Sequence, residues 1–373
     1  MSHSSLELRS TITADGTLKI DLERVAVPDP GPGELLVRVE AAPLNPSDLA
    51  LLFGPADMGT LQAGGTPDAP VLTATVPPHL RGSVSARQDQ SMPVGNEGAG
   101  TVIAAGPDLS DLVGKRVAMI GGAMYAELRL IRPDACIVLP DDASAAEGAA
   151  LFVNPLTALG FVETMRADGH SAIVHAPAAS NLGQMLVRIC KADGVGLVNI
   201  VRSPAQVELL RGIGATHVID SSDPDFRRNL QDAIAETGAT LAFDAIGGGE
   251  TTSTILNAIE AVAASRMERY DRYGSSTMKQ AYIYGALDTG PTILKRGFGF
   301  RWSVGGWLLF NFLGGTDPAI VQRMRDRVAA EMRTTFASNY TASIGLKDML
   351  KPEIAAASQK KATGAKYLIL PNG

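Results

Sequence analysis

Residues 172–190 read AIVHAPAASNLGQMLVRIC, and this stretch decides the fold. Its first residues form a short apolar run, typical of a buried strand, and small residues follow. We expect a helix to begin near Ser180 or Asn181, because apolar residues then recur at helical spacing, at Leu182, Met185, Leu186, Ile189 and Cys190. Strand, tight turn and helix together give the geometry of a dinucleotide site, in which the helix N-terminus offers N–H groups and a partial positive charge to a pyrophosphate.

The turn itself supplies the candidate phosphate-binding residues. Small side chains let a phosphate approach the backbone closely, and the candidates are Ala178, Ala179, Ser180, Asn181, Leu182 and Gly183. The glycine-rich pattern G-x-G-x-x-G is absent, since Ser180 and Asn181 stand where glycines are common. An ordinary strand-to-helix turn explains the motif equally well, so the neighbouring sequence has to decide.

That neighbouring sequence is the end of the next strand, where residues 199–204 read NIVRSP. Sites that bind NAD carry an Asp or Glu about 20 residues after the glycine motif, whereas NADP sites have an arginine nearby. Here the position holds Arg202, followed by Ser203, and no carboxylate precedes Glu208. This favours binding of a 2′-phosphate, and therefore of NADPH, over the alternative of a solvated surface arginine.

Short apolar strands alternate with helical segments along the second half of the chain. The expected strands are 172–176, 195–201, 217–220, 241–245 and 281–284. Such alternation predicts an α/β fold with a doubly wound parallel sheet covered on both faces, here a cofactor domain from 153 to 314. Strand carboxyl ends line the ligand crevice of such a sheet, so Gly247, Tyr284 and Gly285 are further cofactor-binding candidates.

The first third of the chain is expected to be rich in β-strands. Residues 34–41, ELLVRVEA, alternate as a half-buried strand does. Between 53 and 92 the sequence shows no clear period, so this insertion is expected to be either a lid or a mobile surface loop. A final strand at 365–370 is expected to return to the first domain, which would then comprise 1–152 and 315–373.

Composition and charge argue against several classes of protein. The 373 residues carry a net charge of −6, which argues against a nucleic-acid-binding protein, and no basic surface interleaved with aromatic residues is evident. Two cysteines cannot build a four-cysteine zinc site. The start, MSHSSLELRST, has no apolar signal core, and 305–315 is too short to span a bilayer. We expect a soluble cytoplasmic protein with no nucleic-acid or membrane partner.

Several segments, in the same order along the chain, resemble the medium-chain dehydrogenase/reductase superfamily. Apart from the insertion at 53–92 they cover roughly residue 35 to the C-terminus, and they read LVRVEAAPLNPSD, PVGNEGAGTVIAAG, NPLTAL, AASNLGQ, LLRGIGATHVID and ATGAKYLILP. The resemblance implies a GroES-like, β-rich catalytic domain and a Rossmann NADP-binding domain. It also implies a homodimer.

Zinc members of this superfamily carry cysteine and histidine at two active-site turns. This chain has NPSD at 45–48 and NE at 96–97, so no metal site is expected. The resemblance therefore narrows to zinc-independent NADPH:quinone oxidoreductases and the similar NADPH-dependent 2-enoyl thioester reductases. The tyrosine on which the thioester reductases rely is replaced by Pro55 and Ala56, and the tyrosine common in quinone reductases by the residues at 49–50.

The catalytic candidates follow from the resemblance and from their chemistry. Asn45 is expected either to donate its amide to a developing oxyanion or to the nicotinamide ribose, or to stabilise its own turn. Tyr125 is either a proton donor or a packed aromatic residue. The resemblance implies that Thr157 lies near the nicotinamide, with a helix N-cap as its alternative role. It implies that Arg301 and Trp302 form part of the substrate wall, with the core or a dimer interface as the alternative for the tryptophan.

These observations lead to one main functional hypothesis and two alternatives. The main hypothesis is a zinc-independent, NADPH-dependent oxidoreductase that transfers a hydride to a small-molecule quinone or another conjugated carbonyl. The first alternative is a reductase of 2-enoyl thioesters of coenzyme A or a carrier protein. The second is a non-catalytic relative that keeps the fold and binds the nucleotide.

Overall fold

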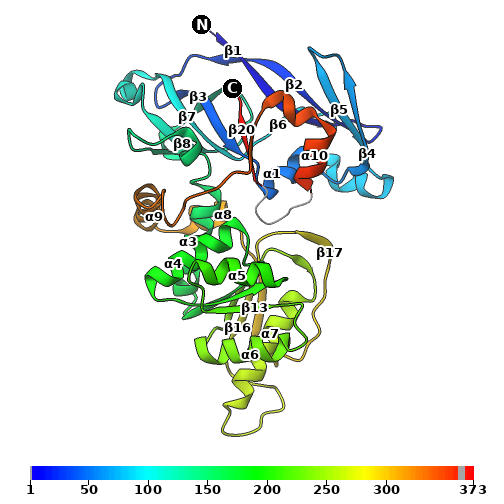
Figure 1. Ribbon diagram of the computed structural model, residues 1–373, viewed down its shortest axis with the longest axis vertical. Helices are drawn as coiled ribbons and strands as arrows, with labels where there is room; N and C mark the ends of the chain where they lie inside the picture. Colours follow the sequence, from blue (N-terminus) through cyan, green and yellow to red (C-terminus); the bar gives the residue numbers. More distant parts are fainter. Residues whose placement is uncertain (1, 360–365) are drawn as a thin grey trace. The chain divides into compact units, whose positions relative to one another are not determined.

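The chain divides into two compact units. The computed structural model describes residues 2–359 and 366–373, and its units are Met1–Val153 with Arg325–Gly373, and Asn154–Met324 (Figure 1). The sequence places the end of the second unit earlier, at 314. The segment around 307–312 stays with the second unit because Trp307 and Phe312 pack beside Gly160, and the Trp307 indole donates to Thr164 Oγ1 at 3.0 Å.

A six-stranded parallel sheet forms the centre of the second unit. Its order is β13-β12-β11-β14-β16-β18, and every neighbouring pair runs parallel. The predicted parallel sheet is confirmed. Its strands, followed by a separate short pair, are β11 (Ala172–Ala176), β12 (Gly196–Val201), β13 (His217–Asp220), β14 (Leu241–Asp244), β16 (Lys279–Ile283), β18 (Trp302–Gly306), β15 (Gly247–Gly249) and β17 (Asp288–Thr292).

Helices alternate with these strands and pack on both faces of the sheet. On one face, strand residues such as Val174 and Ala242 join an apolar cluster with α6 and α7. Phe243 points to the opposite face and stacks on Phe161 of α3, with ring centroids 3.8 Å apart. The helices of the second unit are α3 (Val153–Ala167), α4 (Asn181–Asp193), α5 (Pro204–Gly212), α6 (Phe226–Thr237), α7 (Thr251–Ser265) and α8 (Leu309–Gly315). Helix α9 (Pro318–Ala330) runs from the second unit into the first.

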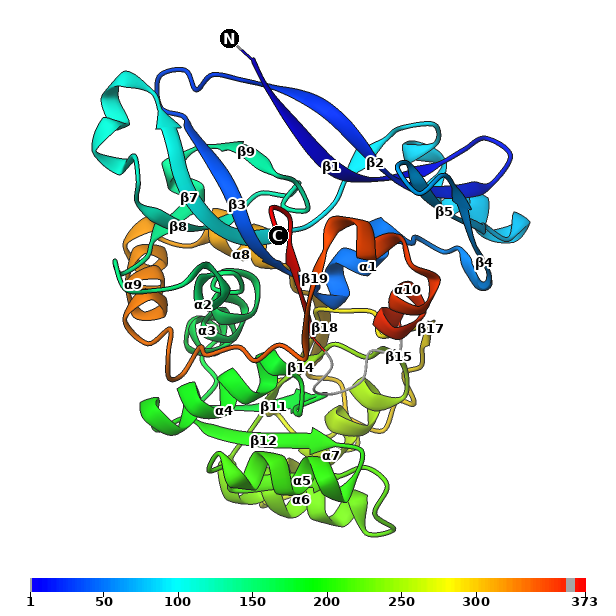
Figure 2. The same cartoon turned by 45° about the horizontal axis from the view of Figure 1, so that its top comes forward.

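Two mainly antiparallel sheets form the first unit, as expected for the catalytic domain (Figure 2). One has the order β10-β8-β7-β3-β20-β19, with β9 also paired to β3, and the other the order β4-β5-β2-β1-β6. The predicted strand at 34–41 is β3. The strands are β1 (Ser2–Ile12), β2 (Thr17–Pro28), β3 (Leu35–Pro43), β4 (Asp57–Gly65), β5 (Pro70–Thr75), β6 (Met92–Pro93), β7 (Glu97–Ala105), β8 (Arg116–Ile120), β9 (Leu128–Ile131), β10 (Cys136–Val138), β19 (Ala342–Gly345) and β20 (Tyr367–Leu370).

Short helices complete the first unit, and one of them positions a candidate residue. Helix α1 begins directly after Asn45, which is its N-cap. The helices are α1 (Pro46–Leu52), α2 (Ala145–Gly148) and α10 (Pro352–Gln359), with the 3-10 turns η1 (Pro78–Arg87), η2 (Pro107–Leu112), η3 (Pro133–Ala135) and η4 (Leu346–Leu350).

The insertion between 53 and 92 is folded, although its sequence shows no clear period, and its role as a lid or a surface loop stays a prediction. It forms the β4–β5 hairpin and η1, and β5 pairs with β2 to extend the N-terminal sheet. Arg87 ties it to the preceding chain, because Nη1 donates to the Leu51 carbonyl and Nη2 to Ser10 Oγ, each at 2.8 Å. No period is visible in the sequence because most side chains of β4 are exposed, and a strand without a buried face shows no apolar alternation.

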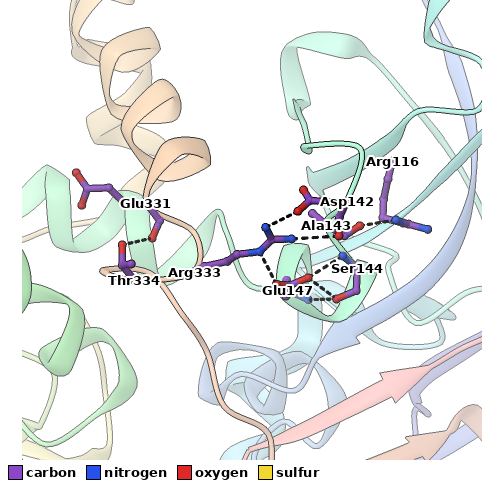
Figure 3. Close-up of polar contacts among 8 residues, drawn as sticks. All are labelled: Arg116, Asp142, Ala143, Ser144, Glu147, Glu331, Arg333 and Thr334. Atoms are coloured by element: carbon purple, nitrogen blue, oxygen red, sulfur yellow. Dashed lines mark hydrogen bonds and ion pairs between the residues drawn. The ribbon is translucent and has the colours of Figure 1, made fainter.

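Strand pairing and one arginine attach the C-terminal segment to the rest of the first unit. β20 pairs with β3 and β19, while residue 365, the start of the predicted strand, lies outside the described residues. Figure 3 shows Arg333 donating from Nε to Glu147 Oε1 at 2.7 Å and from Nη1 to Asp142 Oδ2 at 2.8 Å. Glu147 also closes a capping box with Ser144, so the arginine binds a turn that is already fixed.

One helical stretch, Ala145–Ala167, is long and apolar enough to cross a membrane by length and composition. Of its most apolar window, 78% is buried inside the protein. A mostly buried helix of this kind is weak evidence for a membrane span, since the core helices of globular proteins have the same composition.

Candidate cofactor and catalytic sites

The turn between β11 and α4 holds the predicted phosphate-binding residues in a close-packed arrangement. Ser180 is the N-cap of α4, and its Oγ accepts a hydrogen bond from the Gly183 N–H at 3.1 Å. A Cβ on Gly183 would collide with the carbonyl oxygen of Ala178, so glycine is required at this point. The side chains at three positions of the turn are buried, namely Ala178, Ala179 and Leu182. A ligand would therefore contact the backbone of the turn.

The N-terminus of α4 fits the pyrophosphate of a dinucleotide. The helix runs for 13 residues from Asn181 and follows β11, an interior strand of the sheet. Backbone N–H groups in the first turn of a helix lack acceptors within the helix, and the helix dipole adds a partial positive charge. The turn can therefore hold a dinucleotide without a charged side chain of its own.

Arg202 lies at the carboxyl end of β12, one residue before Ser203, the N-cap of α5. Because β12 is the parallel neighbour of β11, Arg202 and the phosphate-binding turn share one edge of the sheet. The Arg202 N–H donates to Gln206 Oε1 at 3.0 Å, and its side chain is exposed. In the described part of the chain no carboxylate pairs with its guanidinium. These features fit a 2′-phosphate.

The carboxyl ends of β14 and β16 bring together the other cofactor candidates. A Cβ on Gly247 would lie 2.7 Å from the carbonyl oxygen of Gly285, so the two segments are in close contact. The Tyr284 hydroxyl is hydrogen-bonded to His175 Nε2 at 2.7 Å. Burial lowers the pKa of His175 to about 3, which keeps this imidazole neutral. His175 is thus a buried structural residue. At these strand ends, the backbone of Gly247 and Gly285 is the part available to contact a ligand.

The structure places the two predicted substrate-wall residues at the opposite edge of the sheet. Arg301 precedes β18, and Trp302 is paired with Lys279, the first residue of β16. Ligands of a parallel sheet bind at the carboxyl ends of its strands, so the structure does not bring Arg301 and Trp302 to the cofactor turn, and their substrate-wall assignment stays a prediction. Thr157 is buried within α3, and its assignment to the nicotinamide stays a prediction.

In the first unit, Glu97 is the centre of a buried polar cluster. Its Oε1 accepts from Asn45 Nδ2 at 2.7 Å, and Oε2 accepts from the N–H groups of Phe152 at 3.0 Å and Val153 at 2.8 Å. Burial raises the pKa of Glu97, while the charge of Lys366 and these hydrogen bonds oppose the rise. Because Asn45 Nδ2 donates to Glu97, the Asn45 side-chain atom left without a partner among the described residues is Oδ1, an acceptor.

Lys366 and Tyr340, which the sequence analysis missed, belong to the same cluster. Lys366 Nζ, Tyr340 OH and Asn45 Oδ1 are buried and have no hydrogen-bond partner among residues 2–359 and 366–373. Nζ lies 5.5 Å from the centroid of the Tyr340 ring. Burial lowers the pKa of Lys366 and raises that of Tyr340, and the charge of Glu97 acts on both groups. An unpaired buried polar group costs about 1–3 kcal/mol, so three in one cluster indicate a ligand site.

Asp48 supports this cluster from helix α1. Its Oδ2 accepts from the Asn45 N–H at 2.8 Å and its Oδ1 from the Asn96 N–H at 2.9 Å. Burial raises the pKa of Asp48 to about 7, although these hydrogen bonds and Tyr125 oppose the rise. Asp48 accepts from the backbone N–H of Asn45, the N-cap of α1, so the protonation of Asp48 is linked to the position of Asn45.

The variant Asp48→Asn is expected to change how stability depends on pH. Between the ordinary pKa of 3.8 and about 7, the unfolded chain has lost the Asp48 proton while the folded protein retains it. The wild type therefore loses stability as the pH rises through this window, by about 1.4 kcal/mol per pH unit. Chemical unfolding across the window should show the free energy of unfolding of the variant rising relative to the wild type. A difference that is constant with pH would contradict the raised pKa.

Tyr125 is fully buried in the apolar core of the first unit. Its hydroxyl donates to the carbonyl oxygen of Pro43 at 3.0 Å, and burial raises its pKa well above the ordinary value. A phenol held in this way is a packed aromatic residue, which was the alternative to the proton-donor role. We therefore assign Tyr125 no catalytic role.

The two turns that hold zinc ligands in zinc-dependent relatives contain other side chains here. Asn45 is bound to Glu97, and Asn96 Nδ2 donates to Ser47 Oγ at 3.0 Å. Within the described residues, no group of three or more His, Cys, Asp or Glu side chains is placed to hold a metal ion.

Comparisons with known proteins agree with this geometry. The family model for zinc-binding dehydrogenases matches residues 182–264. The chain is 30% identical to the human synaptic vesicle membrane protein VAT-1 homolog, over 63% of this chain and 53% of the relative. It is also 30% identical to a quinone oxidoreductase from Pseudomonas aeruginosa, over 44% of this chain and 52% of the relative. A solved structure from Mesorhizobium loti, described as a candidate NADPH:quinone reductase, matches with a TM-score of 0.73 and 25% identity over 99% of both chains.

The chain is similar to quinone oxidoreductases of the medium-chain dehydrogenase/reductase superfamily. It shares its fold with an enoyl thioester reductase from Candida tropicalis. It spans about half the length of the curated relatives described above. The zinc-binding dehydrogenase model matches a part of the second unit only, and that part does not include the turns at 45–48 and 96–97. The match is therefore compatible with the asparagines at those turns.

Proposed function

We propose that this protein is a zinc-independent, NADPH-dependent oxidoreductase that transfers a hydride to a quinone or another conjugated carbonyl. The observation that carries the proposal is the phosphate-binding turn at 178–183, followed on the next strand by Arg202 in place of a carboxylate. NADPH, when bound, supplies the hydride. The nucleotide-binding turn lies in the second unit, and the polar cluster around Glu97 lies in the first.

The cluster around Glu97 suits an acceptor whose oxygen gains negative charge. The Lys366 ammonium and the Tyr340 hydroxyl are donors without a partner in the described chain. Donors held in a dry site stabilise the charge that develops on a carbonyl oxygen. Burial lowers the pKa of Lys366, so this lysine releases a proton to that oxygen more readily than an exposed lysine would. Asn45 Oδ1 is free to accept from a hydroxyl group of a ligand.

The variant Arg202→Ala is expected to weaken NADPH binding about 10- to 150-fold, because a hydrogen bond to a charged group contributes about 1.5–3 kcal/mol. NADH has no 2′-phosphate, so its binding should change little. Fluorescence titration with both cofactors measures the effect. Arg211→Ala, which removes another exposed arginine from the end of α5, should alter neither affinity. Equal affinity of the wild type for NADPH and NADH would contradict the role of Arg202.

A second candidate, reduction of 2-enoyl thioesters, is favoured by one observation. Tyr340 supplies a buried phenol without a partner in the described residues, although Pro55 and Ala56 replace the tyrosine of thioester reductases. An enoyl thioester is a poorer hydride acceptor than a quinone and depends more on a positioned acid. General acid catalysis typically contributes about 10²–10⁴-fold, so this candidate relies on Tyr340 or Lys366.

NADPH oxidation in the presence of a quinone panel tests the proposed activity. Turnover that depends on the quinone supports a hydride-transferring enzyme. Tight NADPH binding without turnover of any quinone, enone or enoyl thioester would instead favour the non-catalytic, nucleotide-binding alternative. Both outcomes are read from the loss of NADPH absorbance and from a binding titration on the same preparation.

We also propose that the protein is a homodimer, the state that the family resemblance implies. Leu308 and Phe310, at the start of α8, are each 54% exposed, and apolar residues of this kind are commonly covered by a second subunit. Sedimentation velocity measures the state directly, and a monomer at micromolar concentration would contradict the proposal.

A further inference from the structure

Two loops of the second unit expose large aromatic rings. Tyr270 is 92% exposed, Phe300 75% and Tyr273 54%. Tyr270 and Tyr273 lie in the loop 266–274, which follows α7 (Figure 1), and Phe300 lies in the loop 296–301, which precedes β18. Exposed apolar residues that gather in one place mark an interaction surface. Neither loop has a role in the proposed cofactor or catalytic sites.

The two loops pack against each other and form one continuous surface. The rings of Tyr273 and Phe300 meet edge to face, with centroids 5.9 Å apart. Arg272 lies over the face of Tyr273 at 4.7 Å and donates from Nη2 to its hydroxyl at 2.7 Å. Gly299 is close to the Tyr273 backbone, since a Cβ on this glycine would lie 3.0 Å from the Tyr273 carbonyl oxygen. We call this surface, residues 266–274 and 296–301, the basic–aromatic patch.

A buried ion pair holds the base of the patch. Glu260 Oε2 binds Lys279 Nζ at 2.6 Å, and Glu260 Oε1 accepts from the Ser275 N–H at 2.7 Å. Lys279 is fully buried and is the first residue of β16. Ser275 directly follows the loop 266–274, so its hydrogen bond to Glu260 fixes the carboxyl-terminal end of this loop. Tyr270, within the loop, is exposed.

The patch is basic in an acidic protein. It contains Arg266, Arg269, Arg272, Arg296 and Arg301 against Glu268 and Asp271, a net charge of +3, whereas the whole chain has −6. Among the described residues, no carboxylate forms an ion pair with any of these arginines. The Asp271 carboxylate accepts from the Tyr273 N–H at 2.8 Å and so supports the loop itself. Arg266 Nη2 donates to the Ala235 carbonyl at 2.7 Å and Arg272 is bound to Tyr273, so Arg269, Arg296 and Arg301 are the arginines available to an anionic partner.

Charge and geometry discriminate between the possible occupants. A second copy docked through the same patch would bring like charges together, which is unfavourable. Single-stranded nucleic acid needs open ring faces for stacking, but Arg272 covers a face of Tyr273. A net charge of +3 in an acidic chain is also small for a nucleic-acid-binding surface. Exposed aromatic rings beside arginines suit the headgroup region of a bilayer, where rings lie at the interface and arginines bind phosphates.

We propose that the basic–aromatic patch docks the protein on an anionic phospholipid surface, with Tyr270 and Phe300 entering the headgroup region and the arginines contacting lipid phosphates. The proposal goes beyond the proposed redox function and does not depend on it. It replaces the sequence-based expectation that the protein has no membrane partner. That expectation overlooked RMERYDRYG at 266–274, because these residues belong to no enzymatic motif.

Co-sedimentation of the full chain with phospholipid vesicles tests the proposal. We expect binding to phosphatidylcholine vesicles that contain phosphatidylserine, weaker binding to phosphatidylcholine alone, and release at high salt. Each arginine near an anionic surface contributes about a fivefold gain in affinity, so reversing two charges in Arg269→Glu/Arg296→Glu should weaken binding by at least about 25-fold. Tyr270→Ser/Phe300→Ser should weaken it about tenfold, because the rings no longer enter the interface.

Matched controls change the same chemistry elsewhere. Arg24→Glu reverses an exposed charge on β2, and Val138→Ser removes an exposed apolar side chain from β10; neither should alter vesicle binding. Thermal unfolding and NADPH titration show that each variant is folded. Absence of binding to anionic vesicles, or binding that the patch variants leave unchanged, would overturn the proposal. Dissociation of a dimer by these variants would also overturn it, since a second copy would then cover the patch. Binding lost by charge reversal but unaffected by Tyr270→Ser/Phe300→Ser would overturn the entry of the rings into the headgroup region.

Discussion

Replacing Lys366 with methionine is expected to lower kcat/KM for quinone reduction by about 100- to 1,000-fold, the usual effect of removing one donor that stabilises a developing oxyanion. Lys366 Nζ is buried, lies 5.5 Å from the Tyr340 ring centroid and has no hydrogen-bond partner among the described residues. Methionine keeps the apolar stem and removes only the donor and its charge. Steady-state kinetics with NADPH and a quinone measure the effect.

Lys347→Met is the matched control, because Lys347 is an exposed lysine of the same unit. It should leave kcat/KM unchanged. Thermal unfolding separates catalysis from folding, because it shows whether Lys366→Met remains folded at the temperature of the assay. Full activity of Lys366→Met, or an equal loss in both variants, would show that Lys366 does not act on the acceptor.

Gly183→Ala is expected to weaken NADPH binding by at least about 100-fold, which corresponds to about 2.7 kcal/mol. The added Cβ would overlap the carbonyl oxygen of Ala178, a backbone atom that moves only if the turn is distorted. The distortion displaces the first turn of α4, where the pyrophosphate is expected to bind. Calorimetric titration with NADPH measures the loss.

Gly212→Ala provides the control for this prediction. Gly212 is also a helical glycine of the second unit, but nothing lies within 4 Å of its added Cβ. Its substitution should leave NADPH affinity unchanged and stabilise α5 slightly, because alanine favours the helix. If Gly183→Ala binds NADPH as tightly as Gly212→Ala does, the turn at 178–183 is not the phosphate site.

The second unit could be predicted closely from the sequence because its strands are short apolar runs between helices with clear periods. The predicted strands 172–176 and 217–220 match β11 and β13 residue for residue, and α4 begins at Asn181 as expected. In such a unit each strand is buried by the elements next to it in sequence. Local pattern and tertiary structure therefore agree.

The first unit was harder to predict because its strands pair over long sequence distances and several are half exposed. The β1–β2 hairpin and the β4–β5 extension carry mixed or exposed side chains, so their patterns do not mark a buried face. The insertion at 53–92 consequently looked structureless. Its structure depends on pairing with β2 and on Arg87, which contacts Leu51 and Ser10, and neither is visible in a local window of sequence.

The candidate catalytic cluster was predicted only in part, for the same reason. Asn45 stood out because NPSD resembles a family turn, but which of its amide atoms is free depends on Glu97. Lys366 could have been identified as a candidate from the sequence, because it directly precedes the last strand within the stretch ATGAKYLILP that resembles the family. Tyr340 had none, because it lies outside every motif and joins the cluster only in the folded chain. The sequence could not show that Arg301 and Trp302 lie at the amino-terminal end of β18, because order along the chain does not say which end of a strand faces the ligand.

The most direct test of the account is a comparison of kcat/KM with NADPH for three acceptors: a simple quinone, an enone and a 2-enoyl thioester. We expect the quinone to be reduced fastest, the enone next and the enoyl thioester slowest. A quinone delocalises the incoming charge onto oxygen, where Lys366 and Tyr340 are available as donors, whereas a thioester depends more on acid assistance. Turnover of the enoyl thioester well above that of the quinone would contradict the assignment and identify the protein as a thioester reductase.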